Sequence, residues 1–322
     1  MNSKHTIKIL NTVVDYPTEA RVILDSLGKV DYRRPSQKEL LEIIGDYDIV
    51  VIALGLNFHS DILTKTKNLK YIVTATTGLD HIDVMQAERQ GITVLSLRGE
   101  EEFLNTITGT AELAFGLLID LSRFTPWAFE AVKNYQWRRG DFRGHNLCGK
   151  TLGVVGLGRL GTMTARFGAA FGMKVIFTDH NVLLEDFPEY TKVTFETLLE
   201  ASDAISIHVH LSKKTENLFA KKEFEKTKKG AVLINTSRGK IVNEQDLLAA
   251  LQNGQLGGYA TDVLADELFF ETAGFKHHPL VEHAKNHRNV IIVPHIGGYT
   301  TESRIATDLF MAEKLKKQFG KK

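Results

Sequence analysis

The 322-residue sequence contains a single cysteine, Cys148, and this scarcity excludes several classes of protein. A disulfide needs two cysteines and a cysteine-based zinc site needs several, so neither can form within the chain. No other metal-ligand pattern is predicted. Because disulfide-free chains are typical of reducing compartments, the sequence predicts a cytoplasmic protein.

Long apolar runs and an excess of charge of one sign are also lacking. No stretch approaches the roughly 18 consecutive apolar residues that a membrane-spanning helix needs, and residues 1–5 lack the apolar core of a signal peptide. The 40 basic and 39 acidic side chains leave a net charge of +1. This balance provides no broad electrostatic surface for nucleic acid or membrane. The length is sufficient for two folded domains, and an enzyme is the expected class.

Short runs rich in valine and isoleucine recur along the chain, separated by segments long enough for crossover helices. Such runs are typical of parallel strands, which are buried on both faces and need not alternate in polarity. The first series comprises Ile7–Val14, Ile49–Leu54, Tyr71–Ala75 and Ile92–Leu97, and the second comprises Leu152–Gly156, Lys174–Thr178, Ala204–Val209, Ala231–Thr236, Gly258–Val263 and Val290–Val293. Apolar spacing predicts helices over Thr108–Ser122 and Thr301–Gln318. The sequence therefore predicts two parallel-sheet α/β units.

One of these strand runs leads directly into a glycine-rich turn. The spacing G-x-G-x-x-G is met by Gly156, Gly158 and Gly161, and a helical segment follows. In a dinucleotide-binding turn the first glycine permits the tight turn, the second lets the backbone approach a pyrophosphate, and the third lets helix and strand pack closely. The helix N-terminus then offers N–H groups to the phosphates. The alternative is a set of turn glycines in an α/β protein that binds no nucleotide.

An acidic residue completes this pattern. Asp179 follows the next strand run, 18 residues after Gly161, where such a carboxylate accepts hydrogen bonds from the adenosine ribose. Its charge would repel a 2′-phosphate, so the sequence predicts NAD in preference to NADP. The neighbouring His180 is interpreted as a surface residue.

Several motifs in this order resemble those of the D-isomer-specific 2-hydroxyacid dehydrogenases, the family of phosphoglycerate dehydrogenase, hydroxypyruvate reductase and D-lactate dehydrogenase. The first signature is similar over Gly149–Gly161 and the second over Gly230–Gly239. Asp262 resembles part of the third signature and Pro294–Gly298 the last, while Thr76–Asp83 is similar to the family's substrate loop. The resemblance extends over roughly residues 70–300.

This resemblance implies a nested arrangement of two domains. A Rossmann-type parallel-sheet cofactor domain, residues 105–296, would be inserted into a smaller flavodoxin-like α/β substrate domain made of residues 1–104 and 297–322, with the active site in the cleft. The family also implies NAD as cofactor, a small 2-hydroxy or 2-oxo acid as substrate, and a homodimer. No nucleic-acid or membrane partner is expected.

Three residues match the family's catalytic machinery. Arg238 follows a strand run, at the carboxyl end where parallel sheets bind ligands, and its guanidinium suits a substrate carboxylate. His295 follows the last strand run and titrates near neutrality, so it is assigned as general acid and base. Glu267 would stabilise the protonated imidazole, with Asp266 as an alternative partner. On the residues alone, Arg238 could equally be a surface side chain, and most of the 12 histidines must be structural.

The resemblance also assigns residues to cofactor and substrate. Those assigned to the cofactor are Gly156, Gly158, Arg159, Leu160, Gly161, Asp179, Val209, His210, Thr215, Thr236, Ser237, Asp262 and Gly298. Those assigned to the substrate are Thr77, Gly78 and Leu79, through main-chain N–H groups, together with Arg238.

The sequence departs from the family pattern in three places. His210 and Leu268 stand at positions where proline is usual. The segment Leu268–His278 is aromatic, and its side chains would fill a small core under a loop, line a substrate pocket or cover a dimer contact. The loop Ala53–Ser60 lacks the arginine of phosphoglycerate-specific members, which argues against a phosphorylated substrate.

The predicted function is an NAD-dependent D-2-hydroxyacid dehydrogenase or 2-oxoacid reductase, with hydride transfer at C2 of a small acid and His295 moving the proton. D-3-Phosphoglycerate dehydrogenase and glyoxylate or hydroxypyruvate reductase are alternatives within the family. An alternative of another class is an NADH-sensing corepressor-like binding protein. Such relatives often carry a long disordered tail, whereas only a short lysine-containing stretch follows the last predicted helix.

Overall fold

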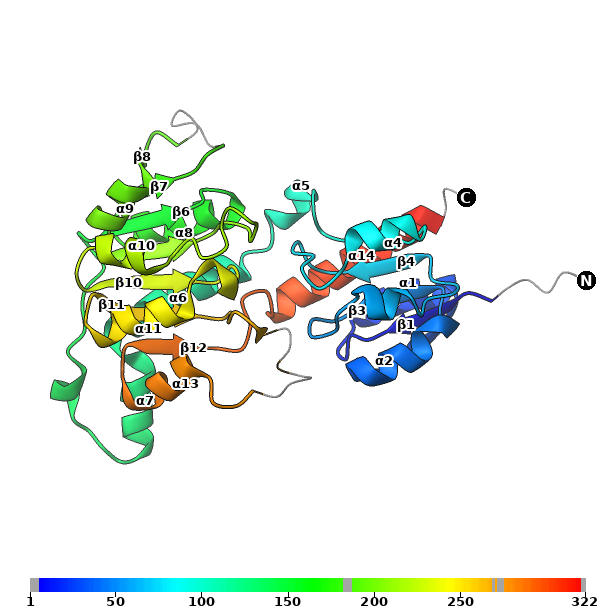
Figure 1. Cartoon of the computed structure of the whole chain (residues 1–322), viewed down its shortest axis with the longest axis horizontal. Coiled ribbons are helices and arrows are strands. Elements are labelled where there is room, and N and C mark those ends of the chain that lie inside the picture. The colour runs from blue at the N-terminus through cyan, green and yellow to red at the C-terminus, as the bar shows by residue number, and fades with distance from the viewer. Residues whose placement is uncertain (1–5, 182–186, 268–269, 271–274, 320–322) are drawn as a thin grey trace, which may run out of the picture. The chain divides into compact units, whose positions relative to one another are not determined.

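The computed structural model describes residues 6–181, 187–267, 270 and 275–319, which form two compact units (Figure 1). Unit 1 contains the described residues of Met1–Thr106, Leu268–Gly274 and Thr301–Lys322, and unit 2 contains those of Ile107–Glu267 and Phe275–Thr300. The chain therefore leaves unit 1 after Thr106, and the residues after Thr300 belong to unit 1 again. The boundaries expected from the sequence fall after residues 104 and 296.

Unit 1 is a parallel sheet with helices in its connections. Its elements are β1 Lys8–Asn11, α1 Thr18–Leu27, β2 Lys29–Tyr32, α2 Gln37–Ile43, a 3₁₀ turn Ile44–Asp46, β3 Ile49–Ile52, α3 Ser60–Leu63, β4 Tyr71–Thr74, α4 Val84–Arg89, β5 Thr93–Leu95, α5 Glu101–Leu104 and α14 Thr301–Phe319. The strands are parallel in the order β2-β1-β3-β4-β5. This is the order of a flavodoxin-like sheet, so the predicted fold class of this unit is confirmed.

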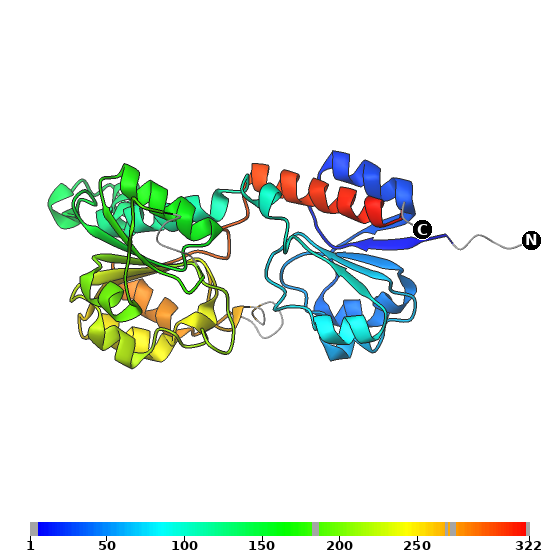
Figure 2. The same cartoon turned by 90° about the horizontal axis from the view of Figure 1, so that it is seen from above.

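Both faces of this sheet are covered, which explains the continuous apolar runs of its strands. In β3, Ile49 and Val51 belong to a core shared with α1 and α14, whereas Val50 and Ile52 belong to a core shared with α2, α3 and α4. Figure 2 shows α14, in red, lying alongside α1 on one side of the sheet. The C-terminal helix thus completes the core of the unit formed by the N-terminal third of the chain.

Unit 2 is a second, larger parallel sheet. Its elements are α6 Gly109–Arg123, α7 Thr125–Lys133, a 3₁₀ turn Arg139–Phe142, β6 Thr151–Val155, α8 Arg159–Ala170, β7 Lys174–Thr178, β8 Thr191–Lys192, α9 Phe195–Ala201, β9 Ala204–Ile207, α10 Lys221–Lys226, β10 Ala231–Asn235, a 3₁₀ turn Gly239–Ile241, α11 Glu244–Gln252, β11 Leu256–Thr261, α13 Pro279–Asn286 and β12 Val290–Ile292. The strand order is β12-β11-β10-β9-β6-β7-β8.

The chain path through this sheet identifies where a ligand would bind. From β6 the chain runs outward through β7 and β8, then returns to β9 on the other side of β6. The carboxyl ends at such a reversal are the usual ligand site of an open α/β sheet. One face is covered by α6 and α8, whose apolar side chains pack on β6, β7, β10 and β11. The Rossmann-type arrangement predicted for the cofactor domain is confirmed.

Each strand run predicted from the sequence overlaps an observed strand, and two of the four edge strands, β2 and β8, are absent from that prediction. Edge strands are only partly buried, so β2 reads as the mixed sequence Lys29–Tyr32 instead of an apolar run. In the described ranges, no helix is long and apolar enough to cross a membrane. The same ranges contain no group of three or more His, Cys, Asp or Glu residues placed to hold a metal ion.

Candidate active site

The predicted catalytic residues follow three neighbouring strands of unit 2. Arg238 comes after β10, Glu267 after β11 and His295 after β12, and these strands are adjacent in the sheet. Because the strands are parallel, their carboxyl ends share one edge of the sheet. The topology therefore collects a cation, a carboxylate and an imidazole at the edge where α/β sheets bind ligands.

Glu267 and His295 form a hydrogen-bonded pair. Glu267 Oε1 lies 2.8 Å from His295 Nδ1. Burial by itself would lower the pKa of His295, but the hydrogen bond and charge of Glu267, with the charge of Asp262, raise that pKa above its ordinary value. Since the carboxylate accepts from Nδ1, Nε2 is the ring nitrogen that could exchange a proton with a substrate. The alternative partner Asp266 instead lies 3.7 Å from the Lys240 ammonium group.

Arg238 is held in the turn after β10. Its Nη1 donates to the carbonyl oxygen of Ser237 at 2.7 Å, and Asn235 Nδ2 donates to the carbonyl oxygen of Arg238 at 3.0 Å. The next residue, Gly239, packs directly on the segment after β11, where a Cβ would fall 2.0 Å from the carbonyl carbon of Leu264. The positive charge of Arg238 lowers the pKa of His295, in opposition to the two carboxylates. Arg238 and His295 are therefore electrostatically coupled.

The backbone of His295 adopts a left-handed conformation, with φ of 46°. A non-glycine residue in this region is strained unless its surroundings fix it. Here the N–H of His295 donates to the carbonyl oxygen of Asp262 at 2.8 Å, and the N–H of Gly297 donates to Asp262 Oδ2 at 2.7 Å. Asp262 is 2% exposed, and its Oδ1 has no hydrogen-bond partner among the described residues. Burial raises the pKa of this carboxyl group.

The glycine-rich turn shows which glycines the chain itself requires. Gly156 has φ of 90°, and a Cβ there would lie 2.8 Å from Val209 Cγ1. A Cβ at Gly161 would lie 2.0 Å from the carbonyl oxygen of Gly156. A Cβ at Gly158, in contrast, would meet nothing within 4 Å. The open space beside Gly158, at the N-terminus of α8, fits a group from outside the chain such as the pyrophosphate of NAD.

Asp179 and Arg159 are tied to the chain around this turn. Asp179 Oδ2 accepts from the N–H of Leu157 at 2.8 Å, and Oδ1 accepts from the N–H of Asn181 at 2.7 Å. Arg159 Nη1 donates to the carbonyl oxygen of Ile107 at 2.6 Å, and burial lowers the pKa of the guanidinium. The carboxylate assigned to the ribose therefore also anchors the glycine-rich turn, a role that the sequence pattern does not reveal.

The remaining residues assigned to the cofactor lie in loops at the same edge of unit 2. The loop after β9 holds Val209, His210 and Thr215, and Thr215 Oγ1 donates to the carbonyl oxygen of His210 at 2.6 Å. In the turn after β10, Ser237 Oγ donates to the carbonyl oxygen of Ile207 at 2.8 Å. The buried Thr236 Oγ1 has no partner among the described residues. Leu160 is the second residue of α8, after Arg159, and Gly298 follows β12.

His208 is a half-buried residue of this edge that the sequence pattern did not assign. Its Nε2 lies 2.8 Å from Ser206 Oγ, and burial lowers its pKa to about 4. It is therefore neutral at physiological pH, and its side chain contributes the contact with Ser206.

The residues assigned to the substrate carboxylate lie in unit 1, in the loop after β4. Thr77, Gly78 and Leu79 are half-buried there. In the neighbouring loop after β3, Arg34 Nη2 donates to the carbonyl oxygen of Leu54 at 3.2 Å. The sequence of Ala53–Ser60 lacks arginine and lysine, but the fold brings this arginine from the segment after β2. Arg34 is therefore a charged residue of this loop region that sequence reasoning missed.

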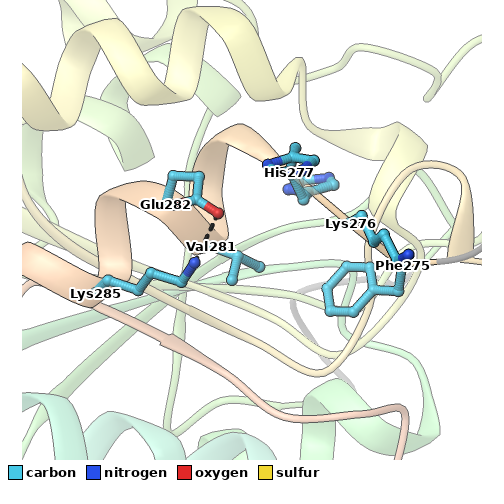
Figure 3. Close-up of a pocket in the computed structure, with 7 residues that line it drawn as sticks. Phe275, Lys276, His277, Val281, Glu282 and Lys285 are labelled. Atoms are coloured by element: carbon cyan, nitrogen blue, oxygen red, sulfur yellow. Dashed lines mark hydrogen bonds and ion pairs between the residues drawn. The ribbon is translucent and has the colours of Figure 1, made fainter.

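Only part of the aromatic segment Leu268–His278 can be placed. Leu268 and Phe269 are outside the described residues. Phe275 is 49% exposed and lines a pocket of about 270 Å³ at the start of α13, together with Lys276, His277, His278, Val281, Glu282 and Lys285. Figure 3 shows Glu282 paired with Lys285 on α13, and Phe275 on the segment before the helix. None of the residues assigned to cofactor or substrate lines this pocket.

Comparison with known proteins agrees with this geometry. Residues 115–297 match the family model described as "D-isomer specific 2-hydroxyacid dehydrogenase, NAD binding domain". The chain is 35% identical to a glyoxylate reductase from Thermococcus litoralis, over 85% of this chain and 81% of that protein. It is 33% identical to a D-3-phosphoglycerate dehydrogenase from Methanocaldococcus jannaschii, over 93% of this chain but only 55% of that longer protein.

A solved structure shows the same fold. The D-lactate dehydrogenase from Aquifex aeolicus, complexed with NAD and lactic acid, matches with a TM-score of 0.82 and 26% identity over 97% of this chain and 95% of that one. The fold, the residues at the strand edge and the glycine-rich turn together define an NAD-dependent oxidoreductase that acts on CH–OH donors. The chain belongs to the D-isomer-specific 2-hydroxyacid dehydrogenase family, as its motifs predicted.

Proposed function

We propose that this enzyme reduces small, unphosphorylated 2-oxoacids to D-2-hydroxyacids, with His295, Glu267 and Arg238 as its catalytic residues. The observation that carries this assignment is the Glu267–His295 hydrogen bond of 2.8 Å at the strand edge that also carries Arg238. A carboxylate on Nδ1 orients the imidazole and stabilises its protonated form. The raised pKa of His295 increases the fraction of that form at a given pH.

In this mechanism the three side chains act on different parts of the reaction. NADH, when bound, supplies the hydride that reaches C2 of the substrate. His295 Nε2 donates a proton to the oxygen on C2 during reduction and takes it back during oxidation. Arg238 binds the substrate carboxylate and polarises the 2-oxo group, which a guanidinium does through paired N–H donors. Glu267 stabilises the imidazolium that exists before proton transfer.

A panel of NADH and 2-oxoacids tests this proposal. Glyoxylate, hydroxypyruvate, pyruvate and branched 2-oxoacids are the substrates to compare. We expect turnover of at least one member, and a His295→Ala variant with kcat lowered by about 10²–10⁴-fold, the usual contribution of general acid–base catalysis. No turnover with NADH binding intact would contradict the proposal and favour the corepressor-like alternative.

We also assign a set of residues to NAD and propose that it is preferred over NADP. The pyrophosphate would lie beside Gly158 and the first turn of α8, including Arg159 and Leu160. The carboxylate of Asp179 would face the ribose and repel a 2′-phosphate. The other contacts are proposed for Gly156, Gly161, Val209, His210, Thr215, Thr236, Ser237, Asp262 and Gly298.

Two variants separate the two roles of Asp179. Asp179→Asn removes the charge but keeps one oxygen acceptor, whereas Asp179→Ala also removes both anchors of the turn. Charge repulsion predicts that Asp179→Asn improves the use of NADPH relative to NADH. Anchoring predicts that only Asp179→Ala strongly weakens binding of both cofactors. A cofactor ratio unchanged in both variants would contradict the assignment.

The choice of an unphosphorylated substrate depends on the loop after β3. Its own sequence carries no arginine or lysine that could bind a phosphate, although Arg34 contacts it through the carbonyl oxygen of Leu54. We therefore expect hydroxypyruvate to be preferred over 3-phosphohydroxypyruvate by about tenfold or more, which corresponds to 1.4 kcal/mol. Equal rates for the two acids, with the phosphorylated one lost in Arg34→Ala, would show instead that Arg34 binds phosphate.

We propose that the protein is a homodimer formed through unit 2 and that it works in the cytoplasm. No residue of α7 is buried, and Tyr135 and Trp137 just after it are 99% and 86% exposed. Aromatic side chains gathered on an exposed segment are typical of an interface. The single cysteine supports a reducing compartment.

Light scattering tests the dimer. We expect twice the mass of one chain, and a monomer when Tyr135 and Trp137 are both replaced by serine. Val22→Ser, at a 65% exposed apolar position on α1, is the matched control and should leave the mass unchanged. A monomeric wild-type protein would contradict the proposal.

A further inference from the structure

The loop after β4 presents unpaired hydrogen-bond donors. Within the described part of the chain, the main-chain N–H groups of Thr77, Gly78 and Leu79 have no hydrogen-bond partner. Half-buried N–H groups without partners are unfavourable unless a ligand or water accepts from them. Successive N–H groups in a loop are suited to an anion such as a carboxylate. The direction in which these N–H groups point therefore affects which anion the loop can bind.

A short chain of side-chain hydrogen bonds fixes one peptide of this loop. Thr76 Oγ1 donates to the carbonyl oxygen of Gly78 at 2.7 Å. Thr76 Oγ1 in turn lies 3.0 Å from Thr74 Oγ1, at the fully buried end of β4. The main-chain oxygen of Thr76 accepts from the N–H of Leu97 at 3.0 Å. Thr76 is thus fixed by its contacts with Thr74 and Leu97, and it in turn fixes the carbonyl group of Gly78.

The chemistry of the groups determines the order of the protons. A carbonyl oxygen can only accept, so the single proton of the Thr76 hydroxyl must be donated to Gly78. Thr76 must then accept from the Thr74 hydroxyl, whose proton is used in turn. Thr74 Oγ1 is left as an acceptor, 3.5 Å from Nε2 of the buried His81. The chain of bonds therefore runs in one direction, from the core of unit 1 to the loop.

Peptide geometry transmits this order to the donor groups. The Gly78–Leu79 peptide is trans and planar, so its C=O and N–H point in opposite directions. Because the Gly78 carbonyl is turned toward Thr76, the N–H of Leu79 must point away from Thr76 and out of the hydrogen-bond chain. We propose that Thr76 is a positioning residue that aims the Leu79 N–H at the carboxylate of the 2-oxoacid substrate, an inference that rests on the proposed function.

The test compares three variants in steady-state kinetics. Thr76→Val keeps the shape but removes the hydroxyl, and we expect the KM for the 2-oxoacid to rise about 3- to 10-fold, the effect of losing one hydrogen bond. The KM for NADH and kcat at saturating substrate should stay at wild-type values, because the catalytic residues belong to unit 2. Thr76→Ser should restore the wild-type KM.

Thr66→Val is the matched control. Thr66 Oγ1 also donates to a main-chain carbonyl oxygen, that of Leu63, at 2.7 Å in the same unit. Its loss should leave the KM for the 2-oxoacid unchanged. An unchanged KM in Thr76→Val, or an equal rise in Thr76→Val and Thr66→Val, would overturn the inference.

Binding of oxamate separates this inference from the proposed function. Oxamate carries the same carboxylate as a 2-oxoacid but is not reduced, so calorimetry on the NADH-loaded protein needs no turnover. Weaker oxamate binding by Thr76→Val, with wild-type binding by Thr66→Val, supports the inference even if every 2-oxoacid in the panel fails. If wild-type protein does not bind oxamate, or Thr76→Val binds it equally well, the inference is wrong.

Discussion

The main-chain N–H of His295 donates to the carbonyl oxygen of Asp262, 2.8 Å away. The side chain of the same aspartate accepts from the N–H of Gly297 at 2.7 Å. Asp262 therefore holds the main chain by hydrogen bonds on both sides of Ile296. These two hydrogen bonds offset the energetic cost of the left-handed conformation of His295, whose φ is 46°. A residue assigned to the cofactor therefore also controls where the imidazole lies and how it titrates.

Replacing Asp262 by asparagine separates these effects. The amide oxygen can still accept from Gly297, so the backbone should be retained, while the negative charge that raises the pKa of His295 is lost. That pKa should fall. Since reduction needs the protonated imidazole, kcat/KM for a 2-oxoacid should decline at lower pH than in the wild type. Asp262→Ala, which lacks the acceptor, should lose activity at all pH values. Identical pH profiles for wild type and Asp262→Asn would refute this role.

Replacing Glu267 by glutamine should lower the pKa of His295 more than Asp262→Asn does. The hydrogen bond and charge of Glu267 are the main contributions that raise the pKa of His295 against burial. Glutamine can accept from Nδ1 but carries no charge, so reduction should be lost at lower pH and oxidation, which needs neutral imidazole, should begin at lower pH. The control is Asp266→Asn, which removes the adjacent carboxylate that is paired with Lys240. The expected readout is the pH dependence of kcat/KM in both directions.

Alanine substitutions at Gly158 and Gly161 should distinguish a glycine that leaves space for a ligand from one that is required for packing within the chain. Gly158→Ala adds a methyl group to open space, so the midpoint of thermal unfolding should stay unchanged while NADH binding weakens about tenfold or more. Gly161→Ala places its methyl group 2.0 Å from the Gly156 carbonyl oxygen and should destabilise the fold by about 1–3 kcal/mol. Calorimetry of both variants measures both quantities. Full NADH affinity in folded Gly158→Ala would argue against a pyrophosphate at this position.

A buried carboxyl group should make the stability of unit 1 depend on pH. Burial raises the pKa of Asp308 to about 6, although Arg304 beside it acts in the opposite direction. A carboxyl group with a raised pKa in the folded state favours folding when protonated. Its contribution is therefore fully present below pH 4 and is lost as the pH rises through 6, a difference on the order of 3 kcal/mol.

Urea unfolding followed by circular dichroism checks this expectation. Asp308→Asn does not titrate, and its amide oxygen can still accept from Arg304, so its free energy of unfolding should change less between pH 4.5 and 7 than that of the wild type. The same pH dependence in both proteins would assign the effect to other groups.

Much of the fold can be predicted from local sequence. Strands such as Ile49–Ile52 are buried on both faces, and their continuous apolar runs identify them without any partner. The glycine-rich turn is also largely local, because Gly156 has a φ of 90° and Gly161 packs on the carbonyl oxygen of Gly156, five residues before it. In contrast, β2 spans Lys29–Tyr32, whose mixed polarity suits a partly exposed edge and is not distinctive in sequence.

The site residues divide in a similar way. Spacing after the strands indicated Arg238, Glu267 and His295 as candidates, because strand ends in a parallel sheet share one edge. It could not show that Arg34 would reach Leu54, or that Thr76 would turn the Gly78 carbonyl. These contacts depend on how loops pack, and the sequence carries no periodic signal for them.

The sequence by itself determined the fold class, the family and the identity of the residues at the sheet edge, since these follow from burial patterns and short spacings. The tertiary structure alone decided that Glu267 and not Asp266 contacts His295, that Asp262 holds the strained backbone of that histidine, and that Asp179 anchors the glycine-rich turn. Each of these is a hydrogen bond between residues brought together by folding, and a hydrogen bond depends on distance and direction in space instead of separation along the chain.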